Sequence, residues 1–442
     1  MKLRDRLKLG HDSNPDLLAA AQEMPAVYHD MKRAIHDQLV DRLELQKLDR
    51  LKPEELRAEL RNTITDLIVA AQLPLNRIER ERLIQELLDE ITGLGPLEPL
   101  LADPTIADIL VNGYNTVFIE REGRILETSV RFRDNDHLMQ IINRIVSRIG
   151  RRVDETSPMV DARLPDGSRV NAIIPPLALD GPALSIRRFG GKPLLAPDLV
   201  AGGSLTPAML DFVAAAVRAR LNILISGGTG SGKTTMLNAM SAFIPPTERI
   251  VTIEDAAELQ LQQRHVVRLE TRPPNLEGKG AITQRDLVRN SLRMRPDRII
   301  VGEVRGAEVM DMLQAMNTGH DGSMTTVHAN SPRDALTRLG AMVGMAGAVY
   351  SESVMSLTLS RALNMVVHLS RGSDGKRRVL SISEITGMEG SVITMQEIFM
   401  FRQRGVDANG HVLGESVATG IRPQSLERIQ RAGYGTDISF RA

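Results

Sequence analysis

The stretch ISGGTGSGKTT, residues 225–235, follows directly on an apolar run that begins at Leu221. Its small residues cannot fill a core, so the backbone here either bends tightly or lets another group approach its amides. The spacing from Gly227 to Thr234 matches the pattern G-x-x-x-x-G-K-[ST], between a predicted buried strand and a predicted helix over residues 234–244. Backbone amides at the start of a helix form an anion nest, so the sequence predicts a nucleotide phosphate site.

Two side chains of this loop are expected to bind different parts of Mg·ATP. Lys233 reaches the β- and γ-phosphates, and the hydroxyl of Thr234 ligates Mg²⁺. The predicted phosphate-binding residues are Gly228, Thr229, Gly230, Ser231, Gly232, Lys233, Thr234 and Thr235.

Composition limits the class of protein. With 442 residues, 42% of them hydrophobic, the chain is long enough for about three folded domains. Lys+Arg and Asp+Glu each number 55, so no net charge attracts nucleic acid, and no nucleic-acid partner is expected. The absence of cysteine excludes disulfides, thiolate zinc sites and a cysteine nucleophile. The charged start, MKLRDRLKLG, and the lack of a long apolar run predict a cytoplasmic protein that meets the membrane through a partner.

Changes in residue pattern and in glycine and proline content along the chain predict four regions. Residues 1–92 read as a polar arm followed by a small bundle of three amphipathic helices, with Leu43 and Ile78 among the packed residues and a merely solvated coiled region as the alternative. Residues 93–189 read as a mixed α+β domain and residues 190–205, rich in glycine and proline, as a linker. Residues 206–442 then hold the nucleotide site and a tail.

Within the α+β region, a hairpin is expected to turn at Glu122 and Gly123, and residues 136–150 to form a helix. Residues 161–176 and 182–189 are expected to form two more strands. Towards the C-terminus, residues 366–387 predict a hairpin turning at Asp374 and Gly375, and residues 403–442 predict loops or a weak docking tail.

Two β-rich runs end in carboxylates. RIVTIED supplies Glu254 and Asp255, and DRIIVGEVRG supplies Glu303. Buried parallel strands deliver such residues to the same sheet edge as the phosphate loop. One acid is then expected to hold the metal and another to deprotonate the attacking water. The alternative for either acid is an exposed residue that merely ends a strand.

Two histidines flank the short apolar run MTTV in TGHDGSMTTVHANSP, residues 318–332. His320 and His328 are eight residues apart, which is not a metal-binding spacing. Taken alone they suggest structural histidines or a sensor of the γ-phosphate.

The phosphate loop, the box IVTIEDAAEL, the box RMRPDRIIVGEVRGAE and the histidine box occur in the order that is typical of the secretion ATPases of type II secretion, type IV pili and type IV secretion. Together with GLGPLEPLLADPTIADILVNG and DARLPDGSRVNAIIPP upstream, their wording most resembles the Flp/Tad tight-adherence pilus assembly ATPases, the CpaF-like branch. The resemblance covers about residues 30–400.

The resemblance implies an α/β fold with a RecA-like P-loop NTPase core, preceded by an α+β, PAS-like N-terminal domain and the small helical bundle. It also implies a homohexameric ATPase motor at the cytoplasmic face of the inner membrane, which uses ATP and Mg²⁺ to drive a pilus platform. Each subunit would clamp ATP between its two domains, and the family's arginine fingers best match Arg169 and Arg187, with Arg163 and Arg188 as rivals and exposed ion pairs as the alternative.

By the same resemblance, Glu254 acts as the catalytic base and Glu303 as the Walker B acid near Mg²⁺. His320 and His328 report the γ-phosphate, although they stand one residue further apart than in the pilus-retraction branch. The tetracysteine zinc module of many type II secretion ATPases is excluded because the chain has no cysteine. A type IV secretion or conjugation ATPase, a RecA-like nucleic-acid motor and a non-catalytic nucleotide-gated scaffold are the alternative functions.

Overall fold

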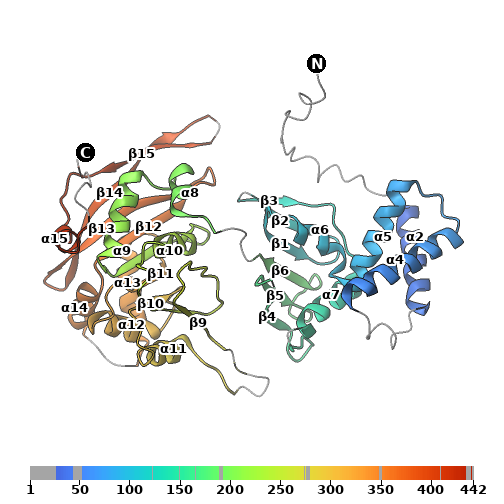
Figure 1. Cartoon of the computed structure of the whole chain (residues 1–442), viewed down its shortest axis with the longest axis horizontal. Helices are drawn as coiled ribbons and strands as arrows, with labels where there is room; N and C mark the ends of the chain where they lie inside the picture. Colours follow the sequence, from blue (N-terminus) through green and yellow to red (C-terminus); the bar gives the residue numbers. More distant parts are fainter. Residues whose placement is uncertain are drawn as a thin grey trace. The chain divides into compact units, whose positions relative to one another are not determined.

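The computed structural model describes residues 26–42, 52–121, 123–148, 150–164, 166–188, 193–272, 274, 279–347, 351–408, 410–434 and 440. The chain divides into two compact units, Met1–Gly191 and Lys192–Ala442 (Figure 1). Each unit has its own hydrophobic cores. The division falls within the segment 190–205 that the sequence predicts as a linker. No described helix has both the length and the apolar character needed to cross a bilayer.

A three-helix bundle opens unit 1 (Figure 1). Pro53 stands in the first turn of the second helix, where its missing N–H removes no bond, and Asn76 caps the third helix by accepting from the Glu79 amide. Apolar side chains from all three helices are buried together, which confirms the predicted bundle; Ile78, however, is 80% exposed, and Leu43 lies outside the described residues. The helices are α2 (Ala26–Arg42), α4 (Pro53–Ala70) and α5 (Arg77–Thr92).

An antiparallel six-stranded sheet in the order β3-β2-β1-β6-β5-β4 forms the rest of unit 1. Alternate residues of its strands, such as Ile109 and Val170, are buried with the apolar side of helix α7. The predicted hairpin is confirmed by the pairing of Arg121 with Arg124, although Glu122 lies outside the described residues. The elements are η2 (Gly95–Leu97), α6 (Glu98–Ala102), β1 (Ile106–Asn112), β2 (Val117–Arg121), β3 (Arg124–Glu127), α7 (Asn135–Arg148), β4 (Met159–Arg163), β5 (Arg169–Ile173) and β6 (Ala183–Arg187).

Residues 161–176 were expected to form one strand, and this expectation is wrong. They contribute to two strands, β4 and β5, which pair antiparallel. The Leu164 amide donates to the Ser168 carbonyl, and the Gly167 amide donates back to the Leu164 carbonyl. The PDG sequence in this stretch is a turn signal, and it outweighs the β propensity of its neighbours.

Part of the predicted linker is ordered against unit 2. Residues 196–201 form helix α8 (Ala196–Ala201), with a proline in its first turn. Leu199 and Leu205 are buried in the core of unit 2. The segment predicted as a linker therefore includes a short helix, because a proline is harmless in the first turn of a helix.

Unit 2 is built on a nine-stranded sheet in the order β15-β14-β13-β12-β7-β11-β10-β8-β9. Neighbouring strands from β12 to β9 run parallel, whereas β12 to β15 alternate in direction. The parallel strands that carry the predicted site are β7 (Ile223–Gly227), β8 (Ile250–Glu254), β10 (Arg298–Val301) and β11 (Met324–His328).

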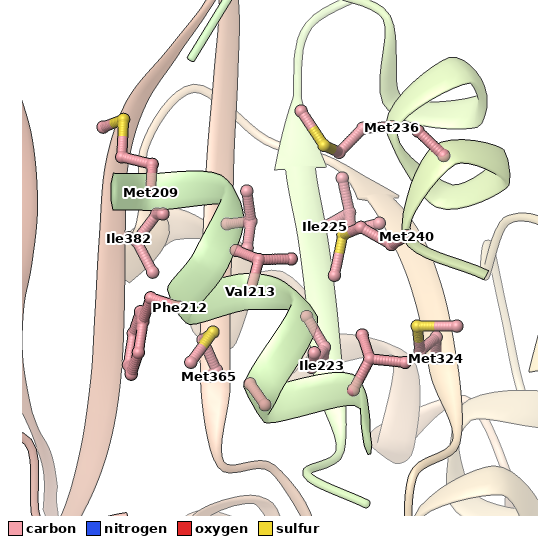
Figure 2. Packing of buried hydrophobic residues seen from close by; sticks show 14 of the residues in the cluster. Met209, Phe212, Val213, Ile223, Ile225, Met236, Met240, Met324, Met365 and Ile382 are labelled. Carbon is pink, nitrogen blue, oxygen red and sulfur yellow. The ribbon is translucent and has the colours of Figure 1, made fainter. Parts of the chain in front are cut away.

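Helices cover both faces of this sheet. On one face, Phe212 and Val213 of α9 pack against Met365 of β12 and Ile223 and Ile225 of β7 (Figure 2). The opposite face buries the alternate residues, such as Leu224, beneath α11 to α14. The elements here are α9 (Pro207–Arg218), α10 (Lys233–Ser241), β9 (Val266–Glu270), α11 (Gln284–Ser291), α12 (Glu308–Asn317), α13 (Pro332–Gly344), α14 (Glu352–Ala362) and β12 (Met365–Arg371).

The C-terminal part extends the sheet. The predicted hairpin at Asp374 and Gly375 is confirmed, but residues 403–442 were wrongly expected to be loops or a tail. Gly405 lies at a register shift, and a side chain at Gly414 would meet the ring of Phe401 at 2.5 Å, so these glycines mark a bulge and a close approach within strands. The elements are β13 (Arg377–Glu389), β14 (Val392–Val406), β15 (Val412–Ala418) and α15 (Leu426–Arg431).

A buried ion pair ties together the amino-terminal edge of the parallel strands. Arg298, at the start of β10, has no exposed surface and donates to both carboxylate oxygens of Glu248, at 2.5 and 3.2 Å. The same guanidinium donates to the carbonyls of Val217, at the end of α9, and Gly322, before β11. One side chain therefore fixes four segments, because each lost bond would leave a buried polar group unpaired.

Candidate active site

The phosphate loop joins β7 to α10 and needs glycine at specific points. Gly232 adopts φ 95°, a left-handed conformation that suits glycine, at the N-terminus of α10. A side chain on Gly227 would meet the Leu369 carbonyl of the adjacent strand at 2.4 Å. The hydroxyl of Ser231 donates to the Gly228 carbonyl at 2.8 Å and closes the loop. The predicted strand, loop and helix are present, with boundaries shifted by one to three residues.

Lys233 is held at the base of this loop. Its ammonium donates to the carbonyls of Gly227 and Gly228 at 3.0 and 2.9 Å, and the residue is only 8% exposed. Burial holds the pKa of Lys233 below its usual value, and Glu303 opposes this effect. A cation with two weakly basic carbonyl partners is well suited to exchange them for phosphate oxygens.

His328 and Glu303 stand beside Lys233. The Nε2 atom of His328 lies 2.9 Å from Glu303 Oε1 and 3.3 Å from Lys233 Nζ. A neutral imidazole can satisfy only one of these contacts through Nε2, because this nitrogen either carries a proton for the carboxylate or offers a lone pair to the ammonium. Burial, with the Lys233 charge, holds the pKa of His328 below its usual value.

Arg305 links Glu303 to Asp255, which directly follows β8. Its Nη2 lies 2.7 Å from Glu303 Oε2, and its Nη1 lies 3.6 Å from Asp255 Oδ2. Burial raises the pKa of Asp255, and the Arg305 charge opposes this rise. Lysine, histidine, glutamate, arginine and aspartate thus form one continuous chain of polar contacts along the sheet edge.

Glu254, at the end of β8, is buried to 3% exposure. Its Oε2 accepts hydrogen bonds from the amides of Glu258 and Leu259, at 2.7 and 2.9 Å, whereas its Oε1 is buried with no hydrogen-bond partner among the described residues. Burial raises the pKa of Glu254 to about 7. A carboxylate with one unpaired oxygen and a pKa near neutrality has the properties of a general base.

Gly302 makes room for this carboxylate and was not singled out from the sequence. A side chain on Gly302 would lie 2.9 Å from Cγ of Glu254, so the Glu254 side chain packs directly over the Gly302 backbone, one residue before Glu303. The signal was present as the glycine between a strand and an acid, where close approach favours glycine.

The structure does not bring His320 to this edge. His320 precedes β11, while His328 ends it, so the two histidines lie at opposite ends of the strand. The His320 amide donates to the Ala315 carbonyl at 3.2 Å, and its Nδ1 lies 3.3 Å from the same oxygen. The geometry of unit 2 therefore gives no support to a γ-phosphate role for His320 within its own subunit.

The predicted finger arginines lie in unit 1. Strand register places Arg163, Arg169 and Arg187 in one row across β4, β5 and β6. Arg169 pairs with Asp161 at 2.6 Å and Arg187 with Asp108 at 3.1 Å, both at partly exposed positions. Arg188 stands apart from this row because it follows the end of β6 and donates to the carbonyl of Asp103.

The fold and the sheet edge together define a P-loop ATPase with a RecA-like core. The family described as "Type II/IV secretion system protein" matches residues 90–420, and the N-terminal domain of type II secretion system protein E matches residues 28–92. The chain belongs to the type II/IV secretion system protein family.

Individual proteins and one solved structure are similar to parts of this chain. A putative conjugal transfer protein of Mycobacterium tuberculosis is 40% identical over 315 residues, which cover 70% of this chain and 89% of that protein. The conjugal transfer protein TrbB of Rhizobium radiobacter is 33% identical over 313 residues, covering 70% of this chain and 91% of its own length. The crystal structure of the pilus retraction motor PilT with bound ADP matches with a TM-score of 0.49 and 22% identity, covering 65% of this chain and 81% of that one.

Proposed function

We propose that the chain is an ATP-driven motor subunit whose hydrolytic site lies at the carboxyl edge of β7, β11, β10 and β8. The observation that carries this proposal is that four residues lie at this one edge, each at the end of a strand, in the loop after it or at the start of the helix that follows. They are Lys233, His328, Glu303 and Glu254.

The loop residues from Gly228 to Thr235 are proposed to bind the phosphates through their amides, and Lys233 to neutralise the β- and γ-phosphates. Thr234 and Glu303 suit Mg²⁺, which prefers a few hard oxygen ligands together with phosphates and water. When bound, Mg²⁺ would neutralise charge on the β- and γ-phosphates. Arg305 must share Glu303 with that ion, and its second carboxylate partner, Asp255, offers it an alternative contact.

Glu254 is proposed to take the proton of the attacking water. Its Oε2 is anchored by two amides, which leaves Oε1 to accept the proton without moving the carboxylate. His328 is proposed to respond to the γ-phosphate, because Lys233 would turn from its carbonyl partners towards the nucleotide and change one of the two contacts of Nε2.

Arg169 and Arg187 are proposed to complete the site when unit 1 closes over bound ATP. Their present partners are partly exposed aspartates, and exposed ion pairs contribute only about 0–1 kcal/mol each, so exchanging them for a phosphate costs little. Closure driven by ATP binding and reversed after hydrolysis would then convert binding energy into movement of the two units.

The load is proposed to be a Flp/Tad-type pilus, assembled through a platform of inner-membrane proteins by a homohexamer at the cytoplasmic face. The residues of the sequence motifs support this choice, because they most resemble those of the Flp/Tad pilus assembly ATPases. The names of the relatives support a second candidate, conjugal transfer by a type IV secretion system. Neither proposal involves direct binding of nucleic acid.

Two measurements test the proposal. Purified full-length protein should release phosphate from Mg·ATP, and Lys233→Ala should not; equal rates would refute the site. In cells that lack the gene, wild-type protein should restore surface pili and Lys233→Ala should not. Restoration of plasmid transfer with no effect on pili would instead establish the second candidate.

A further inference from the structure

The hairpin of β12 and β13 flanks the phosphate loop on the side opposite β11. In the sheet, Leu369 of β12 is in register with Gly227, where β7 gives way to the loop. Strand β12 continues for two more residues and therefore extends beyond this edge. Its last residue, Arg371, pairs with Arg377, the first residue of β13.

Arg377 contacts the loop directly. Its Nε donates to the carbonyl of Gly230 at 2.9 Å, and its Cδ lies 3.2 Å from the point that a Cβ on Gly232 would occupy. In a trans peptide the carbonyl and the next N–H point in opposite directions. By holding the Gly230 carbonyl, Arg377 therefore directs the Ser231 N–H away from the hairpin, towards the Gly228 carbonyl at 3.4 Å, and fixes a peptide that an anion nest would use.

Arg371 adds a second guanidinium beside the same glycine. Its Nη1 lies 3.6 Å from the point that a Cβ on Gly230 would occupy. The hairpin that carries the two arginines is itself anchored: Asp374 pairs with Arg378 at 2.6 Å and accepts from the Val412 amide, and the Arg378 guanidinium lies over the ring of Phe401. These contacts fix the hairpin without using the side chains that face the loop.

We propose that this hairpin is a second wall of the nucleotide site, with Arg377 as a positioning residue of the phosphate loop and the Arg371–Arg377 pair recognising the diphosphate common to ATP and ADP. This inference rests on the proposed function. Lys233, His328 and Glu303 lie towards β11 and β10, so the hairpin serves the shared part of the nucleotide and the opposite side serves the γ-phosphate. The hairpin therefore sets nucleotide affinity, and the other side sets turnover.

Fluorescent ADP and ATP analogues, titrated with Mg²⁺ into the full-length protein, test this division. Arg377→Ala should weaken binding of both nucleotides by about 5- to 30-fold and by similar factors, because it removes a charge-assisted contact that positions the loop. Arg377→Lys should recover little of the loss, because lysine keeps the charge but lacks an Nε–H at this position. The KM for ATP should rise by a similar factor, because the lost contact is one that the ground state and the transition state share.

Arg404→Ala is the matched control, since Arg404 is an exposed arginine of the adjacent strand β14 and is paired with Glu415. Both nucleotides should bind this variant as they bind wild type. Affinities of Arg377→Ala within twofold of the control, or a loss confined to ATP, would overturn the inference while leaving the proposed function intact. Failure of the wild type and the control to bind either nucleotide would overturn both.

Discussion

Replacing Glu254 with glutamine should reduce activity and change stability in a pH-dependent way, and the two effects share one cause. The wild-type base works only when ionised. With a pKa of about 7, about one tenth of the protein has an ionised Glu254 one pH unit lower and about nine tenths one unit higher. The kcat/KM of the wild type should therefore rise with pH between about 6 and 8. Glu254→Gln should bind ATP but lose about 10²- to 10⁴-fold in turnover.

The effect on stability follows from the same pKa. Because the folded-state pKa of Glu254 is raised from 4.5 to about 7, the folded protein binds more protons than the unfolded chain between these values. Stability from this group is therefore greatest below pH 4.5 and falls as the pH rises to about 7. The full penalty is roughly 3 kcal/mol, of which about 2 kcal/mol develops between about pH 5.5 and pH 8.

Urea unfolding of the nucleotide-free full chain at these two pH values measures the penalty. The stability of Glu254→Gln relative to wild type should increase by about 2 kcal/mol from the lower to the higher pH. An unpaired amide nitrogen in place of Oε1 costs the same at both, so it cancels from the comparison. Glu270→Gln is the control, because Glu270 is in register with Glu254 on β9 but exposed. A relative stability independent of pH would refute the burial argument, and wild-type turnover in Glu254→Gln would remove it as the base.

Three further predictions concern other parts of the molecule. Lys233→Ala should lower turnover by at least about 10²- to 10³-fold in a phosphate-release assay, because it removes the buried cation from the phosphates; near-normal rates would show that the loop binds no reacting nucleotide. Arg298→Met should cost about 3 kcal/mol in urea unfolding, since Glu248 keeps only its 3.2 Å contact with Arg220; a loss below about 1 kcal/mol would contradict the proposed role of the ion pair. Arg169→Ala and Arg187→Ala should each lower kcat while leaving ADP affinity unchanged, and unaltered kcat in both would exclude them as fingers.

Much of the site could be predicted because it follows from local sequence. A buried strand, a glycine-rich turn and a helix specify the phosphate loop, and parallel strands place Glu254 and Glu303 at its edge. The same strand argument would have separated His320 from His328, because His320 precedes the five-residue strand β11 and His328 ends it.

Other features depend on contacts between distant parts of the chain. The hairpin at Asp374 was predicted, but nothing in the sequence indicates that β12 pairs with β7 and so brings Arg377 to Gly230. The C-terminal strands were missed because glycine is a weak signal: the same residue marks a loop, a bulge or a close approach, and only the partner strand distinguishes them.

The Arg298 ion pair gives unit 2 two edges of different stiffness. At one edge, four segments converge on a single guanidinium that has no exposed surface. At the other, the reacting groups stand at strand ends, in the loops that follow them and at the start of α10. Sliding of one strand past another would break the buried bonds at the first edge, so these bonds oppose shear within the sheet. In the proposed motor, a nucleotide bound at this edge would then displace the domain as one piece rather than deform it.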